Sequence, residues 1–251
     1  MKSYATLSII ALIASPFSTT AATLAAYVDG PEYADTSTPP ADSSGGITAS
    51  NMAFVGLSGG FGGPVRNTFG TVDLGGDGNV TSNDFWYVSN AQADLASDPG
   101  PTNNPIDDYF GFTISASDTL TSISLDSLTF DWGIGENSSS KTDANFGYRV
   151  FASIDGGAFN SIASGSVTTD INQGQWISLP SANIDLSGLP TTKNQGDIEF
   201  RIQTFSSSID GGSINAFQNF AINGDVVAVP EPSSAALCGI GTLAFIMRRR
   251  K

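Results

Sequence analysis

Four side chains that carry oxygen ligands occur within one twelve-residue stretch of this 251-residue chain. Asp73 stands at position one of the stretch, and it is followed by Asp77 at five, Asn79 at seven and Asp84 at twelve. Gly78 at position six permits the tight turn on which calcium ligands converge. Because calcium prefers several oxygen ligands, this spacing predicts a calcium-binding loop.

The same stretch departs from a complete EF-hand loop in two respects. Gly75 occupies position three, where Asn or Asp is usual, and the flanks Thr68–Val72 and Phe85–Val88 have the composition of strands, not helices. The remaining spacing resembles a single calcium loop of the dockerin family. That family usually keeps an acidic residue at the position of Asp84. A polar hairpin turn between two strands is the alternative, so both interpretations stay open.

Aromatic side chains could form a platform on which the face of a sugar ring stacks. The candidates are Trp86, Tyr87, Trp132 and Trp176. Since Trp86 and Tyr87 are adjacent, one of them must face away from the core if they lie in a strand. Packing in the core is the alternative for each, because aromatic rings dominate the cores of sandwiches.

Paired carboxylates are the remaining route to catalysis, because two acids that flank a sugar can hydrolyse a glycosidic bond. Most Asp residues stand beside Gly, Ser, Asn or Pro, which is typical of turns on a solvated acidic surface. No spacing selects a pair, and we expect no catalysis. The candidate acids are Asp107, Asp108, Asp131, Glu136, Asp197 and Glu199.

The composition excludes several classes of function. The chain has no His, so it has no imidazole for a Ser-His-Asp hydrolase, a Cys-His protease or a His-ligated metal. Its single cysteine, Cys238, cannot form a disulfide within the chain. The body, Tyr27–Val229, contains 23 acids and five bases, and this charge repels nucleic acid and anionic lipid.

The first 26 residues have the pattern of an export signal. Lys2 precedes an apolar run from Leu7 to Phe17, and small residues follow up to Ala26. A first core helix is the alternative, but Pro16 interrupts the run and no polar face repeats at helical spacing. We expect signal peptidase to remove residues 1–26, with the mature chain beginning between Thr23 and Val28.

The last residues form a second segment of distinct composition. Pro230, Glu231 and Pro232 precede an apolar stretch, Ser233–Met247, and a basic cluster of Arg248, Arg249, Arg250 and Lys251. The prolines cannot pair regularly, so the folded body should end near Val229. Fifteen residues of helix span about 22 Å, which reaches across the inner membrane only if the basic side chains extend to the interface.

This tail resembles the PEP-CTERM sorting tail of Gram-negative bacteria, over about 22 residues. The resemblance implies recognition by an exosortase in the inner membrane, cleavage near the motif, and transfer to the cell surface or an exopolysaccharide matrix. The basic cluster should stay on the cytoplasmic side, which places the body outside. A generic short C-terminal anchor is the alternative.

Between the two ends, period-two patterns predict strands. The clearest is Asn145–Asp155, which Asp155-Gly156-Gly157 should end in a turn, and Asp197–Phe205 repeats the pattern. Further turns are expected at Gly45-Gly46 and Asn223-Gly224. Other strands are predicted at Ala53–Leu57, Phe69–Val72, Phe85–Ser89, Tyr109–Ser115, Thr121–Leu125, Leu128–Trp132, Phe159–Ala163, Gln175–Leu179, Ala216–Asn223 and Asp225–Val229.

Many short strands without a long amphipathic helix predict an all-β fold, an antiparallel, jelly-roll-like β-sandwich over residues 27–229. A signal helix and a short C-terminal transmembrane helix should flank it. The stretch Asp94–Pro105 is either a long surface loop or a boundary between two subdomains. Tyr109–Val227 resembles galactose-binding-like jelly rolls, with Gln218-Asn219-Phe220 at the place of their closing motif, and this resemblance implies a sugar ligand.

These observations predict an exported, non-catalytic β-sandwich protein that associates with extracellular polysaccharide. Two alternatives stay open, a calcium-stabilised carbohydrate-binding module and a glycan-active enzyme that uses two carboxylates. No cofactor other than calcium is suggested by the sequence, and no nucleic-acid partner is expected.

Overall fold

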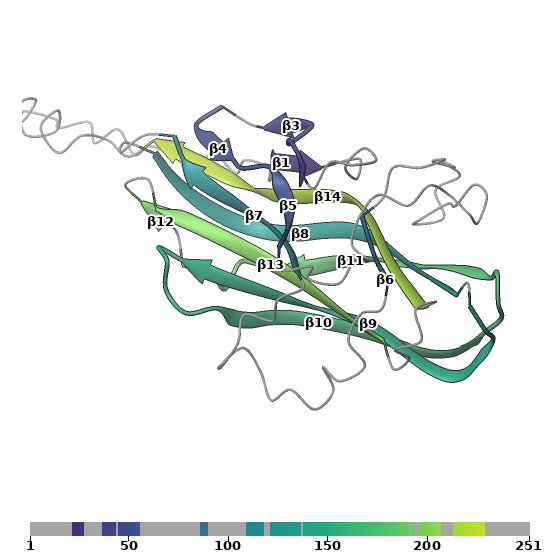
Figure 1. Ribbon diagram of the computed structural model, residues 1–251. Coiled ribbons are helices and arrows are strands. Elements are labelled where there is room, and N and C mark those ends of the chain that lie inside the picture. The colour runs from purple at the N-terminus through teal and green to yellow at the C-terminus, as the bar shows by residue number, and fades with distance from the viewer. Residues whose placement is uncertain are drawn as a thin grey trace, which may run out of the picture.

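The described part of the chain is an all-β structure of two antiparallel sheets that lie face to face (Figure 1). In this computed structural model the described residues are 22–27, 37–43, 45–55, 86–89, 109–117, 121–136, 138–190, 192–193, 196–206 and 213–228. They form a jelly-roll-like β-sandwich, and the predicted fold class is therefore confirmed for this part of the chain. No helix in these ranges is long and apolar enough to cross a membrane.

The first sheet, sheet A, is organised around two sixteen-residue strands that pair along their whole length. Their ladder runs from Ser213 opposite Glu136 to Ala228 opposite Thr121. In spatial order the sheet contains β11 (Trp176–Asp185), β8 (Thr121–Glu136), β14 (Ser213–Ala228), β1 (Ala22–Tyr27) and β3 (Asp42–Ser43), with β12 (Thr192–Lys193) on β8 and β6 (Trp86–Ser89) on β14.

The second sheet, sheet B, is built around a hairpin and a central strand. The hairpin consists of β9 and β10, and β13 pairs with β9 on one side and β7 on the other. In spatial order the sheet contains β10 (Asn160–Ile171), β9 (Lys141–Ile154), β13 (Asp197–Ser206), β7 (Tyr109–Ala116), β5 (Met52–Val55) and β2 (Ser37–Thr38), with β4 (Ile47–Ala49) on β7.

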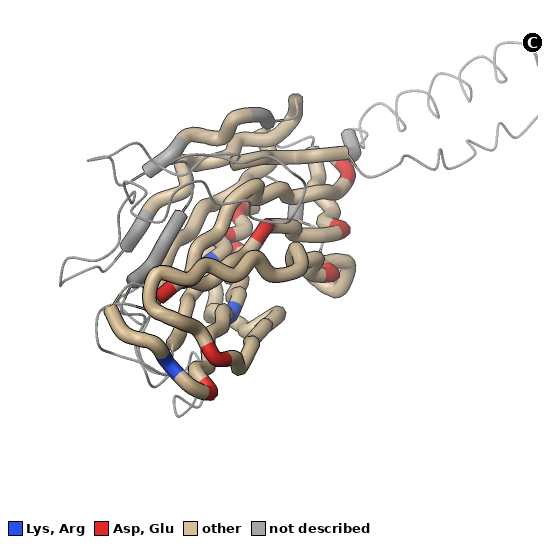
Figure 2. The backbone as a smooth tube through the Cα atoms, turned by 90° about the vertical axis from the view of Figure 1, so that its right-hand side faces the viewer, with Lys and Arg blue, Asp and Glu red and all other residues tan. Residues whose placement is uncertain are grey.

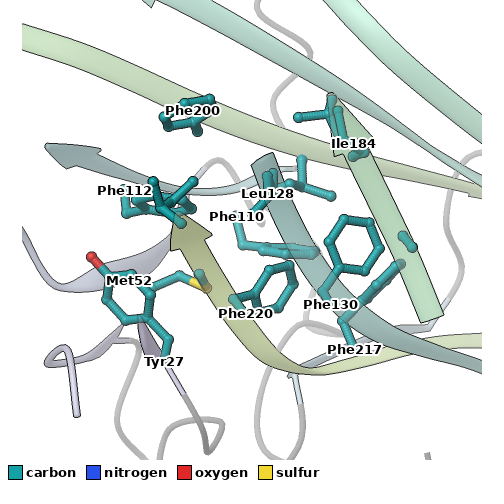
Figure 3. Close-up of a cluster of buried hydrophobic side chains, with 14 of the residues drawn as sticks. Tyr27, Met52, Phe110, Phe112, Leu128, Phe130, Ile184, Phe200, Phe217 and Phe220 are labelled. Atoms are coloured by element: carbon teal, nitrogen blue, oxygen red, sulfur yellow. The ribbon is translucent and has the colours of Figure 1, made fainter. Parts of the chain in front are cut away.

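Aromatic rings from the inner faces of both sheets form the centre of the core (Figure 3). The ring centroids of Phe110 on β7 and Phe217 on β14 are 5.3 Å apart, and those of Phe130 on β8 and Tyr148 on β9 are 5.0 Å apart. These contacts join the sheets directly. Each fully buried side chain of this kind contributes about 1.5–3 kcal/mol through loss of apolar surface from water.

The two strands with the clearest period-two pattern are confirmed as β9 and β13. Alternate residues of each are buried in the core, and the predicted turn after β9 is present. Asp155 and Gly156 have φ values of 52° and 68°, which is typical of the two-residue turns that fit twisted hairpins. The predicted turn at Gly45-Gly46 is also present, with φ of 92° at Gly46.

The turn predicted at Asn223-Gly224 is wrong, because β14 runs through both residues. A register shift between them accommodates the glycine within the ladder. A Cβ at Gly224 would collide with the carbonyl oxygen of Ser124 and would lie 3.1 Å from Leu24 Cδ1. The glycine therefore serves close packing of β14 between two strands. The strands predicted at Thr121–Leu125 and Leu128–Trp132 are one continuous strand, β8.

The boundary expected after Ala26 falls inside β1, a strand that the sequence did not predict. β1 lies between β14 and β3, and Leu24, Ala25 and Tyr27 each have 0% exposure. Ala22–Tyr27 are thus part of the sandwich in this structure.

Several predicted features lie outside the described residues. They are the calcium-loop residues Asp73, Asp77, Asn79 and Asp84, the strand at Phe69–Val72, the stretch Asp94–Pro105, the signal helix and the apolar segment of the tail.

Burial of two tyrosines generates a prediction for alkaline pH. Burial raises the pKa of the Tyr27 phenol and of the Tyr148 phenol above the ordinary value of 10.0. The fold therefore favours the neutral phenols, and their contribution to the free energy of unfolding is complete below about pH 10 and is lost as the pH rises further. The melting temperature of the full chain should fall between pH 10 and pH 12.

The double variant Tyr27→Phe, Tyr148→Phe should show a shallower alkaline decrease, because it removes both titrating groups. Thermal melts followed by circular dichroism at pH 8, 10, 11 and 12 would measure this decrease. An identical pH dependence in the wild type and the double variant would contradict the prediction.

Candidate functional site

The richest set of polar and aromatic side chains lies on the outer face of sheet B. Because Ile198, Phe200 and Ile202 of β13 point into the core, the alternate residues Glu199 and Arg201 face outward. Two aromatic residues contact Arg201, one from β7 and one from the connection that follows the β9 turn. We call Tyr109, Phe159, Glu199 and Arg201 the Arg201 platform.

The guanidinium of Arg201 is held by two rings and one carboxylate. Its Cζ lies 3.7 Å from the ring centroid of Phe159 and 4.4 Å from that of Tyr109, and its Nε donates a hydrogen bond of 2.8 Å to Glu199 Oε1. Each cation–π contact is worth about 0.5–2 kcal/mol. The ion pair, with side-chain exposures of 18% for Arg201 and 38% for Glu199, adds at most about 1 kcal/mol.

The turn after β9 positions Phe159. Asp155 and Gly156 reverse the chain, Gly157 N donates to the carbonyl oxygen of Ile154 at 2.9 Å, and Ser153 Oγ donates to the carbonyl oxygen of Gly157 at 2.7 Å. The hairpin therefore brings Phe159 back over the neighbouring strand, where it meets Arg201. The hydrogen bonds of this turn thus hold Phe159 in its place in the platform.

Gln203 lies in the next outward position of β13, in register with Tyr109 of β7 and Arg149 of β9. It is 6% exposed, and its Oε1 has no hydrogen-bond partner among the described residues. Buried polar atoms are nearly always hydrogen-bonded, so an acceptor of this kind calls for a partner.

The Tyr109 phenol stays protonated at neutral pH. Burial raises its pKa, the nearby Arg201 charge lowers it by a smaller amount, and Glu199 raises it again. A neutral phenol keeps its donor hydrogen and can also accept. The platform therefore combines flat apolar rings with hydrogen-bond donors and acceptors, which is chemistry suited to a hydroxyl-rich ligand.

The candidate carboxylates are dispersed in the described structure. Asp131 and Glu136 belong to β8 in sheet A, whereas Asp197 and Glu199 belong to β13 in sheet B. Figure 2 shows most of the acidic residues near strand ends and turns. Asp107 and Asp108 lie outside the described residues. Of the four described acids, Glu199 is paired with Arg201, and Glu136 and Asp131 accept hydrogen bonds from other parts of the fold.

Glu136 is fully buried and holds the connection between β8 and β9. Its Oε1 accepts from Ser138 N at 2.8 Å and Ser138 Oγ at 3.0 Å, and its Oε2 accepts from Ser213 Oγ at 2.8 Å. Asp131 accepts a hydrogen bond of 2.7 Å from Asn219 Nδ2 on the neighbouring strand. These bonds give both carboxylates a role in the fold.

The predicted aromatic candidates all belong to sheet A, and the structure does not bring them to the platform. Trp132 is 6% exposed, packs in the core against Tyr148, and donates from Nε1 to Asn215 Oδ1 at 3.3 Å. Trp176 is half-buried on β11, where its ring covers Gly135. The remaining two, Trp86 and Tyr87, are in β6 opposite Phe217 and Ala216 of β14.

Among the platform residues, the sequence singled out only Glu199, as a candidate acid, and did not predict the platform as a site. The period-two pattern of 197–205 does place Glu199 and Arg201 on the face away from the core. Their contact with Tyr109 and Phe159, however, depends on the order of strands in sheet B, which no local pattern contains.

Metal binding has no candidate among the residues that the structure describes, since they contain no cluster of three Asp, Glu or Cys side chains able to hold an ion. The predicted calcium loop, Asp73 to Asp84, lies outside these residues. Calcium binding there therefore stays a prediction.

A scan of family models matches residues 228–251 to the PEP-CTERM protein-sorting motif. The chain carries a PEP-CTERM sorting tail. This confirms the prediction made from Pro230, Glu231, Pro232 and the terminal arginines. The PEP-CTERM motif begins at Ala228, the last residue of β14, so the sorting tail follows the sandwich without an intervening linker.

A comparison with curated proteins finds no match. Solved structures that are similar to this chain include the cleaved adhesin domain of Lys-gingipain from Porphyromonas gingivalis, at 14% identity over 71% of this chain and 92% of that chain, with a TM-score of 0.33. A CBM22 xylan-binding domain from Paenibacillus barcinonensis is 8% identical over 82% and 97%, with a TM-score of 0.32.

A cellulose-binding domain from Cellulomonas fimi β-1,4-glucanase C is 15% identical over 64% of this chain and 95% of that chain, with a TM-score of 0.26. Because these three scores are all below 0.5, the description of the fold depends on the strands and their pairing in this chain.

The contrast between two glutamates generates a prediction. Glu136→Ala should lower the free energy of unfolding by about 2–4 kcal/mol, because buried hydrogen-bond donors lose their acceptor. Glu199→Ala, at the partly exposed ion pair, should lower it by at most about 1 kcal/mol. Urea unfolding of the two variants beside the wild type would measure both values. An equal cost for the two substitutions would contradict the structural role of Glu136.

Proposed function

We propose that this chain is an exported, non-catalytic β-sandwich protein that its PEP-CTERM tail directs to the cell surface or extracellular matrix of a Gram-negative bacterium. There it binds extracellular polysaccharide through the Arg201 platform. The observation that carries the proposal is the sorting motif at 228–251, which joins directly to the last strand of the sandwich.

The position of the tail supports sorting. β14 ends at Ala228, and Pro230 and Pro232, which follow it in the sequence, have no amide hydrogen to donate to a strand ladder. The processing partners are signal peptidase at the N-terminal leader and an exosortase at the tail. Contact with the inner membrane is transient and depends on the apolar segment that follows the motif.

The platform supports a neutral, hydroxyl-rich ligand. Arg201 is paired with Glu199, so the two charges offset each other, and the body as a whole is acidic. A strongly acidic protein repels anionic polymers. The phenol of Tyr109 would exchange hydrogen bonds with sugar hydroxyls, while the partly exposed rings of Tyr109 and Phe159 contact the carbon skeleton.

The dispersion of the described carboxylates supports a binding role over a catalytic one. A two-carboxylate glycosidase needs its acids on opposite sides of one bond, about 5–10 Å apart. Glu136 accepts four hydrogen bonds inside the fold, and Glu199 is paired with Arg201. Release of reducing sugar from the bound polysaccharide would favour the enzyme instead.

A calcium-stabilised carbohydrate-binding module is a second candidate, favoured by the oxygen spacing from Asp73 to Asp84. A ligand that binds the native state raises the apparent stability by mass action. Comparison of melting temperatures in calcium and in chelator distinguishes this module from a calcium-independent one.

Removal of the tail tests the sorting role. In the native host, deletion of Pro230–Lys251 should move the protein from the cell surface to the periplasm or the medium, because the segment that the exosortase recognises is lost. Immunoblots of cell fractions would measure the distribution. The exposed substitution Thr168→Ala on β10 serves as a control that leaves the tail intact. Unchanged surface display of the deletion variant would contradict the role of the tail.

Substitutions in the platform test the binding role. Arg201→Ala and Phe159→Ala should each weaken retention of the full chain on the host exopolysaccharide at least tenfold, equivalent to about 1.4 kcal/mol of binding free energy. Affinity electrophoresis in gels containing the polysaccharide would measure the retention, and urea unfolding would verify that the variants are folded.

Trp176→Ala is the matched control for binding, because Trp176 is a partly exposed aromatic residue on sheet A. It should bind like the wild type. Loss of binding in the Trp176 variant, with normal binding in the two platform variants, would place the binding surface on the other sheet.

A further inference from the structure

The N-terminal strand of the sandwich restricts where the export leader can be removed. β1 pairs with β14 from Ala22 opposite Gly224 to Tyr27 opposite Phe220, and it also pairs with β3 (Figure 1). Leu24, Ala25 and Tyr27 have no exposed surface. The strand is therefore an internal member of sheet A, and its residues belong to the mature fold.

Side-chain contacts attach β1 to both neighbouring parts of the structure. Tyr27 Oη donates a 2.5 Å hydrogen bond to the carbonyl oxygen of Ser50, which lies between two strands of sheet B. Thr23 Oγ1 donates to Asn223 Oδ1 on β14 at 3.1 Å. Loss of the first half of β1 would expose the core beside Leu24 and leave the β14 backbone without its partner.

Signal peptidase requires small residues one and three positions before the cut. Three bonds near the end of the leader have Ala one position before the cut and Thr three positions before it, namely Ala21–Ala22 with Thr19, Ala22–Thr23 with Thr20, and Ala25–Ala26 with Thr23. The first two cuts keep the buried part of β1. The third removes Leu24 and Ala25 from the core.

We propose that signal peptidase cuts this chain at Ala21–Ala22 or at the adjacent Ala22–Thr23 bond, so that the mature protein begins at the first residues of β1. The proposal rests on the export that the proposed function includes. Of the starts expected from the sequence, between Thr23 and Val28, it keeps only Thr23 and adds Ala22, because both keep every buried residue of the strand.

The register of sheet A places the start of β1 near the end of β14. Ala22 lies opposite Gly224, four residues before the end of β14 at Ala228, so the two ends are separated by about 14 Å along the strand direction. The leader and the sorting tail therefore leave the sandwich at the same end. Both can insert in one bilayer while β1 pairs with β14.

N-terminal sequencing and intact-mass measurement of the full chain exported by a Gram-negative host test the proposal. A mature chain that begins at Ala22 or Thr23 is expected. A start at Ala26 or Tyr27 would overturn it while leaving export intact. Retention of Met1 on a protein confined to the cytoplasm would overturn both this proposal and the proposed export.

A matched pair of variants gives a second readout. The double variant Ala21→Leu, Ala22→Leu places a large residue before both proposed bonds, and at least tenfold more precursor should accumulate than in the wild type. Ala26→Leu, beyond both bonds, should be processed at the wild-type rate. Normal processing of the double variant to a chain that begins at Ala26 would overturn the proposal.

Discussion

The ladder between β8 and β14 is the constraint on which the rest of this structure depends. The two strands pair from Ser213 opposite Glu136 to Ala228 opposite Thr121, and their inner faces provide Phe130, Phe217 and Phe220 to the core. β1 adds to the outer edge of β14, and the sorting tail begins where β14 ends. One long strand thus links the core, the N-terminal strand and the sorting tail.

The sequence predicted those elements in which a period-two pattern and burial coincide. β9 and β13 alternate between core and outer face along most of their length, so their residue types contain the information needed. The PEP-CTERM tail was equally predictable, because prolines, an apolar stretch and a basic cluster occur in order within a short segment. In these cases the residue types within one short segment are enough to predict the element.

Features that depend on tertiary contacts could not be predicted in this way. The residues of β1 are mostly small or apolar, which is typical both of the end of a leader and of a buried strand. Only the pairing with β14 shows that they form a strand. The pair Asn223-Gly224 is typical of a turn, but in the structure Gly224 lies within β14 and packs closely against β8. The Arg201 platform joins β7, β13 and the β9 turn, so it exists only once sheet B has its order of strands.

The central claim is that the sandwich folds outside the cytoplasm and that the tail directs it to the cell surface. Brief proteolysis of intact cells, followed by mass spectrometry of the released peptides, tests this claim most directly. The account predicts release of peptides from the sandwich, including those that contain Arg201, before any cytoplasmic protein appears. Sandwich peptides that appear only after lysis, together with cytoplasmic proteins, would contradict it.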